Sequence, residues 1–562
     1  MDTILLVGLV VGGTALLSWP LGHYMKWVMD PGPGAGPRRR ALDRAFERVA
    51  GRLGREPQAW KRYTIAMLAF NAVMFLVAFA FMALQQVLPL DPDGKGAVEP
   101  SLIFNTIASF TSNTNLQHYS GEVAMSYLSQ LFSLMWLQFV SAATGVAVLA
   151  GLARGLTGRS EMGNFFVDVQ RAAFLLLLPA ALAVATLMAL GGTPMTLAGA
   201  AAATTLEGTE QVIARGPVAA FVAIKQLGTN GGGFFGPNST HPFENPTFWT
   251  NGLSMICIIL IPMASVWMFG RIVGRMRHAA TVFGVMLFLL LAKIAGAVYF
   301  EAAPTQAFAG LPAVEQVAGN VEGKEMRFGT PYGSGPLWGA LTTSTSNGSV
   351  GAMHDSLNPV AGLMPMIGMW LNATFGGVGV GMVNMFVYII IAVFIAGMMV
   401  GRTPEYLNRR VEAREMKLAA LAVIAHGFFV LAGTALFAVT PWGVDTLNNW
   451  GPHGFSEILY EFSSASANNG SGFEGLGDNT VPWNVATGLV MLLNRYVPII
   501  LPLAIAGSLA RKRATAQSAG TLSVQDATFG VMLVGTILII GALTFFPAAA
   551  LGPIAEHFLY VS

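Results

Sequence analysis

The stretch KQLGTNGGGFFGPNSTHPFENPTFW, residues 225–249, lies between two hydrophobic runs of the chain. It contains three consecutive glycines, three prolines and several Asn, Ser and Thr residues. In a soluble protein this composition is typical of a surface loop. The place of the stretch in the fold therefore depends on the kind of protein to which it belongs.

The composition indicates a membrane protein. The chain has 562 residues, of which 54% are hydrophobic and 11% are charged, and its mean hydropathy is +0.59. Soluble domains carry about 25% charged residues. The net charge of +2 gives no reason to expect nucleic-acid binding. The single cysteine, Cys257, excludes a disulfide or a cysteine metal cluster within one chain.

Ten stretches approach the roughly 20 apolar residues that a helix needs to cross a bilayer. They are residues 3–24, 64–84, 128–152, 172–191, 252–270, 280–300, 377–400, 418–440, 485–508 and 527–550. As drawn, these stretches contain no Asp or Glu. Proton-coupled carriers and intramembrane enzymes usually place carboxylates near the bilayer midplane, so neither class is favoured.

Basic residues are concentrated in alternate connections between these stretches. Segments 26–62, 152–171, 271–278, 401–417 and 511–513 hold 24 of the 31 Lys and Arg residues. Positive charge accumulates in short cytoplasmic loops. The pattern therefore predicts ten transmembrane helices with both termini outside the cytoplasm, and residues 225–249 fall in an extracytoplasmic connection.

Four outer connections repeat one pattern, in which a short apolar segment precedes small polar residues and glycine. They contain SLIFNTIASFTSNTNLQ (101–117), PVAAFVAIKQLGTNGGGFFG (217–236), PLWGALTTSTSNGSVG (336–351) and FSEILYEFSSASANNGSGFEG (455–475). Alignment on asparagine matches Ser112-Asn113-Thr114 with Thr229-Asn230-Gly231, Ser346-Asn347-Gly348 and Asn468-Asn469-Gly470. The aligned asparagines are 117, 117 and 122 residues apart. Such a period indicates a repeated supersecondary unit.

A re-entrant pore loop satisfies the physical constraints on this unit. Non-helical backbone at membrane depth is tolerated only inside protein or along a watery cavity. Four such loops around one axis present carbonyls that replace the hydration shell of an ion, and each short helix directs its partially negative C-terminal end toward that ion. The alternative is that these segments are four polar hairpins, rich in turn residues for local reasons.

The motifs QLGTNGGGFF, NSTHPFENPT, TSNGSVGAM, SANNGSGFEG and GRTPEYL closely resemble the A subunit of Kdp-type potassium-transporting ATPases, within the superfamily of potassium transporters. The resemblance runs from the first span to the tenth. It implies a potassium filter in residues 112–117, 229–233, 346–349 and 468–472. The candidate filter residues are Ser112, Asn113, Thr114, Asn115, Gln117, Thr229, Asn230, Gly231, Gly232, Gly233, Ser346, Asn347, Gly348, Asn468, Asn469 and Gly470. In the family, the position of Gln117 is associated with potassium affinity.

The resemblance also implies partners and a location. A P-type ATPase catalytic B subunit hydrolyses ATP and receives ions through an intramembrane tunnel, and a C subunit and a small single-span subunit complete the complex. The membrane is then the bacterial plasma (inner) membrane, and membrane lipid surrounds the chain. The chain has neither a G-x-x-x-x-G-K-[ST] loop nor an Asp-Lys-Thr-Gly phosphorylation signature. We therefore expect no bound nucleotide and no catalytic site here, and no metal other than potassium at the filter.

Four further features have two interpretations each. Arg495 resembles a superfamily arginine below the filter that meters cations, or it snorkels at the end of its span. Lys293 snorkels or pairs within the bundle. Arg402 and Glu405 in GRTPEYLNRR form a coupling surface for the ATPase, or the loop is only a basic anchor. The glycines of FGGVGVGMVN (375–384) break a region too long for one helix and form a gate, or they permit close helix packing; these candidates are Gly376, Gly377, Gly379 and Gly381.

The predicted fold is all-α and polytopic, with four pseudo-repeats of span, re-entrant pore loop and span around one pore. The predicted units are a peripheral helix (1–25), repeats at 63–152, 171–272, 279–401 and 417–509, and a C-terminal helix (526–562). Two other functions stay open. One is a Trk- or Ktr-like potassium channel or symporter pore subunit, and the other is a membrane scaffold or lipid-modifying enzyme.

Overall fold

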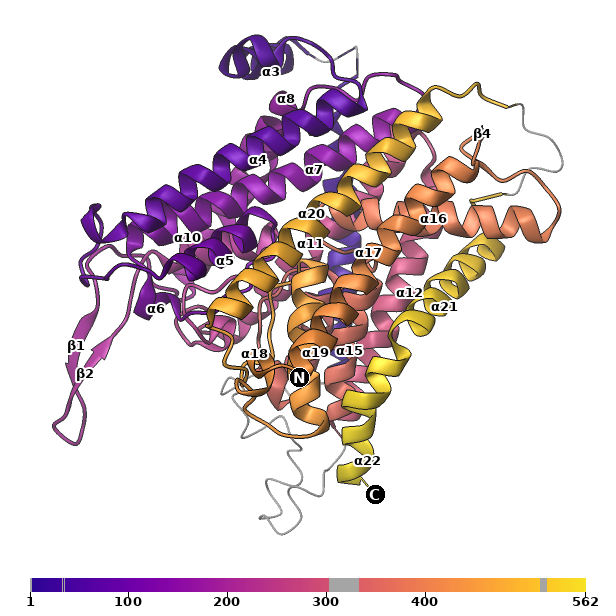
Figure 1. The fold of residues 1–562 in the computed structure, drawn as a ribbon. Helices are drawn as coiled ribbons and strands as arrows, with labels where there is room; N and C mark the ends of the chain where they lie inside the picture. The colour runs from indigo at the N-terminus through magenta and orange to yellow at the C-terminus, as the bar shows by residue number, and fades with distance from the viewer. Residues whose placement is uncertain (1–2, 33, 35, 303–332, 516–522, 562) are drawn as a thin grey trace.

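The computed structural model describes residues 3–32, 34, 36–302, 333–515 and 523–561, and Figure 1 shows its path. Residues 303–332, which include Lys324 and Arg327 of the third outer connection, lie outside the described residues, as do 1–2 and 562 of the predicted terminal units. Within the described ranges, ten helical segments are long and apolar enough to cross a membrane. The predicted number of spans is therefore confirmed.

The ten segments are Thr3–Met29, Trp60–Ala83, Ser129–Leu156, Phe165–Leu190, Phe248–Val273, Met276–Glu301, Val380–Met399, Ala413–Ala438, Val481–Ala510 and Ala527–Leu559. Their α-helices are α1 (Thr3–Val7), α2 (Gly13–Met29), α4 (Trp60–Ala83), α7 (Trp136–Leu156), α8 (Phe165–Arg171), α9 (Leu178–Leu190), α11 (Phe248–Val273), α12 (Met276–Glu301), α16 (Val380–Met399), α17 (Ala413–Ala438), α20 (Val481–Ala510), α21 (Ala527–Ala549) and α22 (Ala555–Val561). Short π-helical turns at Gly8–Gly12, Ala172–Leu177 and Ala550–Ile554 join the pieces of three segments, and another at Ser129–Met135 begins the segment that continues as α7.

The described helices extend beyond the apolar runs, which corrects one expectation. Asp168, Glu301 and Glu415 lie inside the helical segments, although the apolar runs contain no acidic residue. Each lies within a few residues of a segment end, and the buried carboxylate of Asp168 is paired with Arg154 at 2.6 Å. The apolar run marks the part of each helix that is suited to hydrocarbon, and polar turns continue past it.

Burial separates central helices from peripheral ones. In their most apolar stretches, 72%, 78% and 83% of the residues of Ser129–Leu156, Phe248–Val273 and Val380–Met399 are buried, against 28% for Thr3–Met29. The central helices α7, α11 and α16 pack against one another, and the first span lies along α11. Peripheral segments leave large apolar side chains exposed, among them Leu182 and Phe428. Such surfaces are suited to contact with lipid.

Four buried short helices precede the polar loops in the described part of the chain: α5 (Pro100–Thr111), α10 (Val218–Leu227), α14 (Ser334–Ser344) and α19 (Pro452–Ala467). Pro100 and Pro452 occupy the first turn of their helices, where the missing N–H costs nothing. The Glu99 carboxylate accepts a hydrogen bond from the N–H of Leu102 and caps α5. The predicted apolar helix before each loop is thus present.

The region 361–400 is broken, as its length requires. Helix α15 (Pro359–Leu371) ends before α16 begins at Val380. Four residues between them have positive φ, namely Asn372 (43°), Phe375 (63°), Gly376 (58°) and Gly379 (75°). The break therefore follows the glycine-rich motif.

The remaining elements are short and connect the helices described above. They are α3 (Pro37–Ala50), α6 (Gly121–Ala124), α18 (Pro441–Val444), the hairpin of β1 (Ala201–Thr204) and β2 (Glu210–Ile213), the hairpin of β3 (Glu405–Tyr406) and β4 (Arg409–Arg410), and 3-10 turns at Gly51–Gly54, Gln85–Val87, Asn238–Thr240 and His354–Ser356. Both chain ends lie at the end of the molecule that carries β1, β2 and α18, while α3 and β4 lie at the opposite end (Figure 1). The fold is therefore consistent with an even number of crossings.

Candidate functional site

The same type of backbone hydrogen bond occurs once in each of the four polar loops. We refer to residues 112–117, 229–233, 346–349 and 468–472 as loop segments 1 to 4. In each, an N–H bonds to the carbonyl five residues earlier, at the end of the short helix. These bonds join Thr114 to Ser109 (2.9 Å), Asn230 to Lys225 (3.0 Å), Asn347 to Thr342 (2.8 Å) and Asn469 to Ser464 (2.9 Å).

The shared bond corrects the alignment of loop segment 1 by one residue. Thr114, and not Asn113, is structurally equivalent to Asn230. The positive φ angles support this equivalence. In every segment, the residues immediately before and after Thr114 or its equivalent have a positive φ. They occur at Asn113 and Asn115, Thr229 and Gly231, Ser346 and Gly348, and Asn468 and Gly470. Residue type misled the alignment, since asparagine in segment 1 occupies the two positive-φ positions.

Three glycines bring the segments into backbone-to-backbone contact. A Cβ on Gly231 would lie 1.9 Å from the Asn347 carbonyl oxygen. A Cβ on Gly348 would lie 2.1 Å from the Asn469 oxygen, and one on Gly470 would lie 2.0 Å from the Thr114 oxygen, each in the next segment. The contacts run from segment 2 to 3, from 3 to 4 and from 4 to 1. The predicted convergence of the four segments is thus present.

Asparagine side chains brace these contacts. The Asn347 amide donates to the carbonyls of Lys225 (3.2 Å) and Gln226 (3.4 Å) at the end of α10. The Asn469 amide donates to the Thr342 carbonyl at the end of α14 (3.0 Å). Loop segments 3 and 4 are therefore each attached to the short helix that precedes the neighbouring segment.

Gln117 closes the remaining contact, between segments 1 and 2. Its Oε1 accepts from the Gly233 N–H (2.6 Å) and its Nε2 donates to the Gly233 carbonyl (3.0 Å). Asn113 also donates to the Thr229 carbonyl (2.8 Å). This contact uses side chains because Asn115, and not glycine, occupies the position of segment 1 that is equivalent to Gly231, Gly348 and Gly470.

A buried ion pair, which no sequence motif predicts, supports segment 2 from behind. The Lys225 ammonium bonds to Glu244, and both side chains are fully buried. The other Glu244 oxygen accepts from the N–H groups of Phe234 (2.6 Å) and Phe235 (3.0 Å). Asn238, which accepts from Lys225, donates to the Gly231 carbonyl (2.6 Å). A lone lysine inside an apolar helix was the available signal.

The glycine-rich break lies against segments 2 and 3. The N–H of Gly376 donates to the Ser344 carbonyl (2.9 Å), and a Cβ on Gly377 would lie 3.7 Å from the Thr229 hydroxyl oxygen. Gly379 and Gly381 are close-packing positions, since a Cβ on either would lie within 2.2 Å of a carbonyl oxygen. The motif thus combines close packing with a position beside the loops.

Arg495 lies inside the bundle, 5% exposed, so it does not snorkel. Its guanidinium donates to the Ser141 carbonyl (3.1 Å), and the Ser141 hydroxyl donates to Oδ1 of Asn113 in segment 1 (2.8 Å). Lys293 is also 5% exposed, and its Nζ has no hydrogen-bond partner among the described residues. The snorkelling interpretation therefore fails for both cations in the described part of the chain.

A small cavity lies beside segments 3 and 4. Its volume is about 50 Å³, and Asn372, Asn384, His426, Ser466 and Asn494 contribute polar groups to its wall. The Asn494 amide and His426 Nε2 are buried without hydrogen-bond partners within the described ranges. A cavity larger than about 15 Å³ that offers several polar partners has room for a water molecule.

The motif GRTPEYLNRR forms the antiparallel β3–β4 hairpin. In its strand register, Glu405 lies opposite Arg410 and Tyr406 lies opposite Arg409. Tyr406 is fully buried and anchors the hairpin in the core. Arg402 is exposed and Glu405 half-buried. The two predicted coupling residues therefore lie at the surface.

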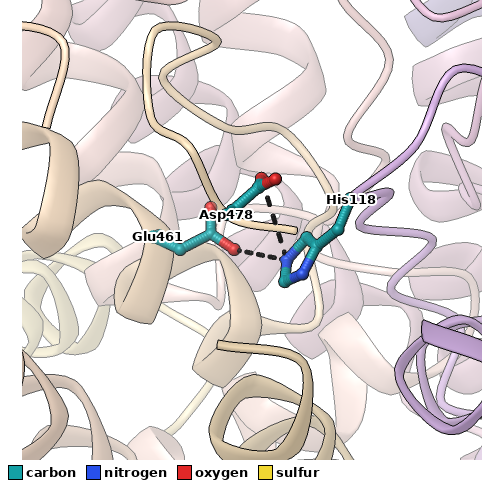
Figure 2. A group of neighbouring side chains, drawn as sticks. All are labelled: His118, Glu461 and Asp478. Carbon is teal, nitrogen blue, oxygen red and sulfur yellow. Dashed lines mark hydrogen bonds and ion pairs between the residues drawn. The ribbon is translucent and has the colours of Figure 1, made fainter. Parts of the chain in front are cut away.

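A second polar cluster lies next to segment 1. His118 Nε2 is 3.1 Å from Glu461 Oε1 and 3.8 Å from Asp478 Oδ2, and Figure 2 shows both carboxylates on the same side of the imidazole. Although burial opposes the charged form, Asp478 and Glu461 raise the pKa of His118 to about 9. Burial raises the pKa of Asp478 to about 7, against the lowering effect of His118. These residues come from distant parts of the chain, which carry no local motif.

Comparison with known proteins finds similar sequences over nearly the whole chain. The family described as Potassium-transporting ATPase A subunit matches residues 8–558. The potassium-transporting ATPase potassium-binding subunit of Rhodospirillum centenum is 47% identical, over 99% of this chain and 97% of that protein. The subunit of the same description from Parabacteroides distasonis is 45% identical, over 97% of each.

The solved structure of the potassium transporter TrkH from Vibrio parahaemolyticus is similar in fold, with a TM-score of 0.52. The structural match covers 89% of this chain and 98% of the TrkH chain, and the two sequences are 13% identical. That likeness concerns the fold alone. The family match and the two relatives extend over nearly the whole chain, and the chain therefore belongs to the potassium-transporting ATPase A subunit family.

Proposed function

We propose that this chain is the potassium-selecting subunit of an ATP-driven uptake complex, and that loop segments 1 to 4 are its selectivity filter. The observation that carries the proposal is the ring of contacts among the four segments, in which three glycines lie against carbonyl groups of the next segment. A ring of backbone carbonyls from four loops is how a protein replaces the hydration shell of potassium.

The donor groups in the segments fit a monovalent hard cation. Hard cations prefer oxygen ligands. Oδ1 of Asn115 and Oδ1 of Asn230 are buried without hydrogen-bond partners in the described part of the chain. The C-terminal ends of the four short helices add partial negative charge. In an extended strand, successive residues alternate in direction, so the paired positive-φ residues allow consecutive carbonyls to face one side.

The ion then leaves the filter toward a partner subunit. The cavity beside segments 3 and 4 supports an exit at that side, because Asn494 and His426 offer it polar atoms that have no hydrogen-bond partner among the described residues. Gly376 and Gly377 are suited to a gate beside the filter, and Arg495 to limiting cation passage by charge repulsion. A P-type ATPase B subunit, contacting Arg402 and Glu405, would hydrolyse ATP, and C and small single-span subunits would complete the complex.

A matched pair of substitutions tests the filter. We expect Gln117→Leu to raise the potassium concentration for half-maximal ATP hydrolysis by the assembled complex roughly 5- to 150-fold. Two hydrogen bonds to Gly233 are lost, each worth about 0.5–1.5 kcal/mol, and about 1.4 kcal/mol corresponds to tenfold in affinity. The control is Gln86→Leu, because Gln86 is exposed. An unchanged potassium dependence of assembled Gln117→Leu would contradict the filter assignment.

The alternative is a Trk-like channel or symporter, which the fold likeness alone would permit. In that case the purified chain in liposomes would take up radioactive rubidium without ATP or partners. We expect no such passive flux. Uptake by the chain alone would overturn the ATP-driven mechanism while leaving the filter in place.

We also propose that both termini are extracytoplasmic in a bacterial inner membrane. The native Cys257 is buried, 2% exposed, so it gives no background in a labelling experiment. A cysteine at Leu206, which is fully exposed in the β1–β2 turn, is expected to react with a membrane-impermeant maleimide in intact spheroplasts. A cysteine at the exposed Ala413 should react only after permeabilisation. The reverse pattern would invert the topology.

A further inference from the structure

The cluster of His118, Glu461 and Asp478 has no role in the proposed filter. His118 follows loop segment 1, Glu461 lies in α19, and Asp478 lies between segment 4 and α20. One ligand atom from each lies within 4.8 Å of the other two. Figure 2 shows the two carboxylates converging on one imidazole nitrogen. The residues approach from three segments that the fold alone brings together.

The neighbours of His118 determine which ring nitrogen carries a hydrogen. The Ser101 hydroxyl donates to the Glu99 carboxylate, so its oxygen accepts from the Asn484 amide (3.1 Å). Asn484 Oδ1 therefore faces His118 Nδ1 (2.8 Å) and accepts its hydrogen. Nε2 is left as the nitrogen that faces the carboxylates. A hydrogen bond to the other ring nitrogen is the usual support of a metal-binding histidine.

The spacing fits a small transition-metal ion. Tetrahedral zinc with ligands at about 2.0–2.1 Å places neighbouring ligand atoms roughly 3.3 Å apart. The distances from His118 Nε2 to the Glu461 and Asp478 oxygens, 3.1 and 3.8 Å, lie on either side of that value. Imidazole is a ligand for zinc and its neighbours, and not for potassium or magnesium. One divalent ion also neutralises the two carboxylates when the imidazole is uncharged.

We propose that His118 Nε2, Glu461 Oε1 and Asp478 Oδ2 bind a divalent transition-metal ion, with Zn²⁺ as the representative. The Asp478 side chain is 24% exposed, so the ion enters from the aqueous side and water supplies the fourth ligand. His118 is adjacent to Gln117, and Glu461 belongs to the short helix before segment 4. The metal would therefore tie segment 1 to segment 4, where Asn468 already donates to the Thr114 hydroxyl (2.9 Å).

A second histidine provides a matched comparison. His453 also contacts two carboxylates, but through different nitrogens: Nδ1 bonds to Glu556 (2.7 Å) and Nε2 to Asp355 (2.9 Å). Glu457 lies nearby, but its Oε1 already accepts from the backbone and side-chain nitrogens of Asn449. The two carboxylates that His453 contacts therefore lie at opposite ring nitrogens, whereas both carboxylates beside His118 face Nε2.

Calorimetry on the full-length chain in detergent, stripped of metal, tests the proposal. We expect one equivalent of Zn²⁺ to bind, with a binding enthalpy that depends on the buffer because the metal displaces a proton. His118→Gln and Glu461→Gln should each weaken binding at least tenfold. Asn484→Leu, which keeps the three ligands, should weaken it about 10- to 100-fold. His453→Gln should leave affinity and stoichiometry unchanged.

A measurement on the native chain avoids any folding defect of the variants. Co²⁺ should bind in place of Zn²⁺ and give the intense visible absorption of a four- or five-coordinate site, and Zn²⁺ should abolish it. Mg²⁺ and Ca²⁺ should not compete. The assignment is overturned by weak octahedral cobalt absorption, by equal competition from Ca²⁺, by binding that survives His118→Gln, or by binding that His453→Gln removes.

Discussion

A single methyl group at Gly348 is expected to disable potassium selection. Its Cβ would lie 2.1 Å from the Asn469 carbonyl oxygen, far inside any real contact. The residue also has a φ of 87°, a conformation that costs an L-residue about 1–2 kcal/mol. Either segment 3 or segment 4 must move, so we expect Gly348→Ala to raise the half-activating potassium concentration by well over tenfold and to reduce discrimination against sodium.

The measurement is potassium- and sodium-stimulated ATP hydrolysis by the assembled complex. Gly284→Ala is the matched control, because a Cβ on this helical glycine meets nothing within 4 Å, and alanine favours a helix. Gly470→Ala should reproduce the effect, since its Cβ would lie 2.0 Å from the Thr114 oxygen. A Gly348→Ala complex with native potassium affinity would show that the segment 3–4 contact does not define the ion site.

Removal of the Lys225 charge is expected to produce the largest loss of stability. Lys225→Met leaves the fully buried Glu244 carboxylate without its cation. Breaking a buried ion pair on one side typically costs about 3–5 kcal/mol. Glu244 also holds the N–H groups of Phe234 and Phe235, so the damage should extend to segment 2. The thermal unfolding midpoint of the full-length chain in detergent measures the effect.

Two comparisons make the result interpretable. The double variant Lys225→Met with Glu244→Gln should be more stable than Lys225→Met alone, because no buried charge remains unpaired. Arg62→Met removes a surface pair in which Arg62 and Glu56 are 73% and 80% exposed, and it should cost less than about 1 kcal/mol. Equal destabilisation by Arg62→Met and Lys225→Met would contradict a special role for the buried pair.

The architecture could be predicted from the sequence because its determinants are local. Apolar length gives the ten spans, and the region 361–400 is too long to cross as one helix, so the break before Val380 follows from arithmetic. Repeated spacing indicated four equivalent loops. The structure corrects the alignment of these loops by one residue. Backbone conformation, and not residue identity, shows that Thr114 is structurally equivalent to Asn230.

The surroundings of the loops could be predicted only in part. Lys225 in an apolar helix was visible, but its partner Glu244 required the intervening turn to fold back. His118 and Glu461 are 343 residues apart, and no periodicity relates them. The polar ends of helices could not be predicted for another reason. Hydropathy identifies only the part of a helix that lies in hydrocarbon, whereas the helices that carry Asp168 and Arg154 continue beyond that part.

The three glycine contacts and the one glutamine contact are encoded at separate positions of one chain. In a filter built from four identical subunits, every substitution appears four times, so small adjustments of the ring are not available to a single mutation. Here each quarter of the ring can vary alone. The contact between Gln117 and Gly233 is made by a side chain and not by the close approach of two backbones, so a change of side chain at this position can adjust it without a backbone clash. Related chains that differ in ion affinity should therefore have diverged first at this contact, while the three glycine contacts stayed constant.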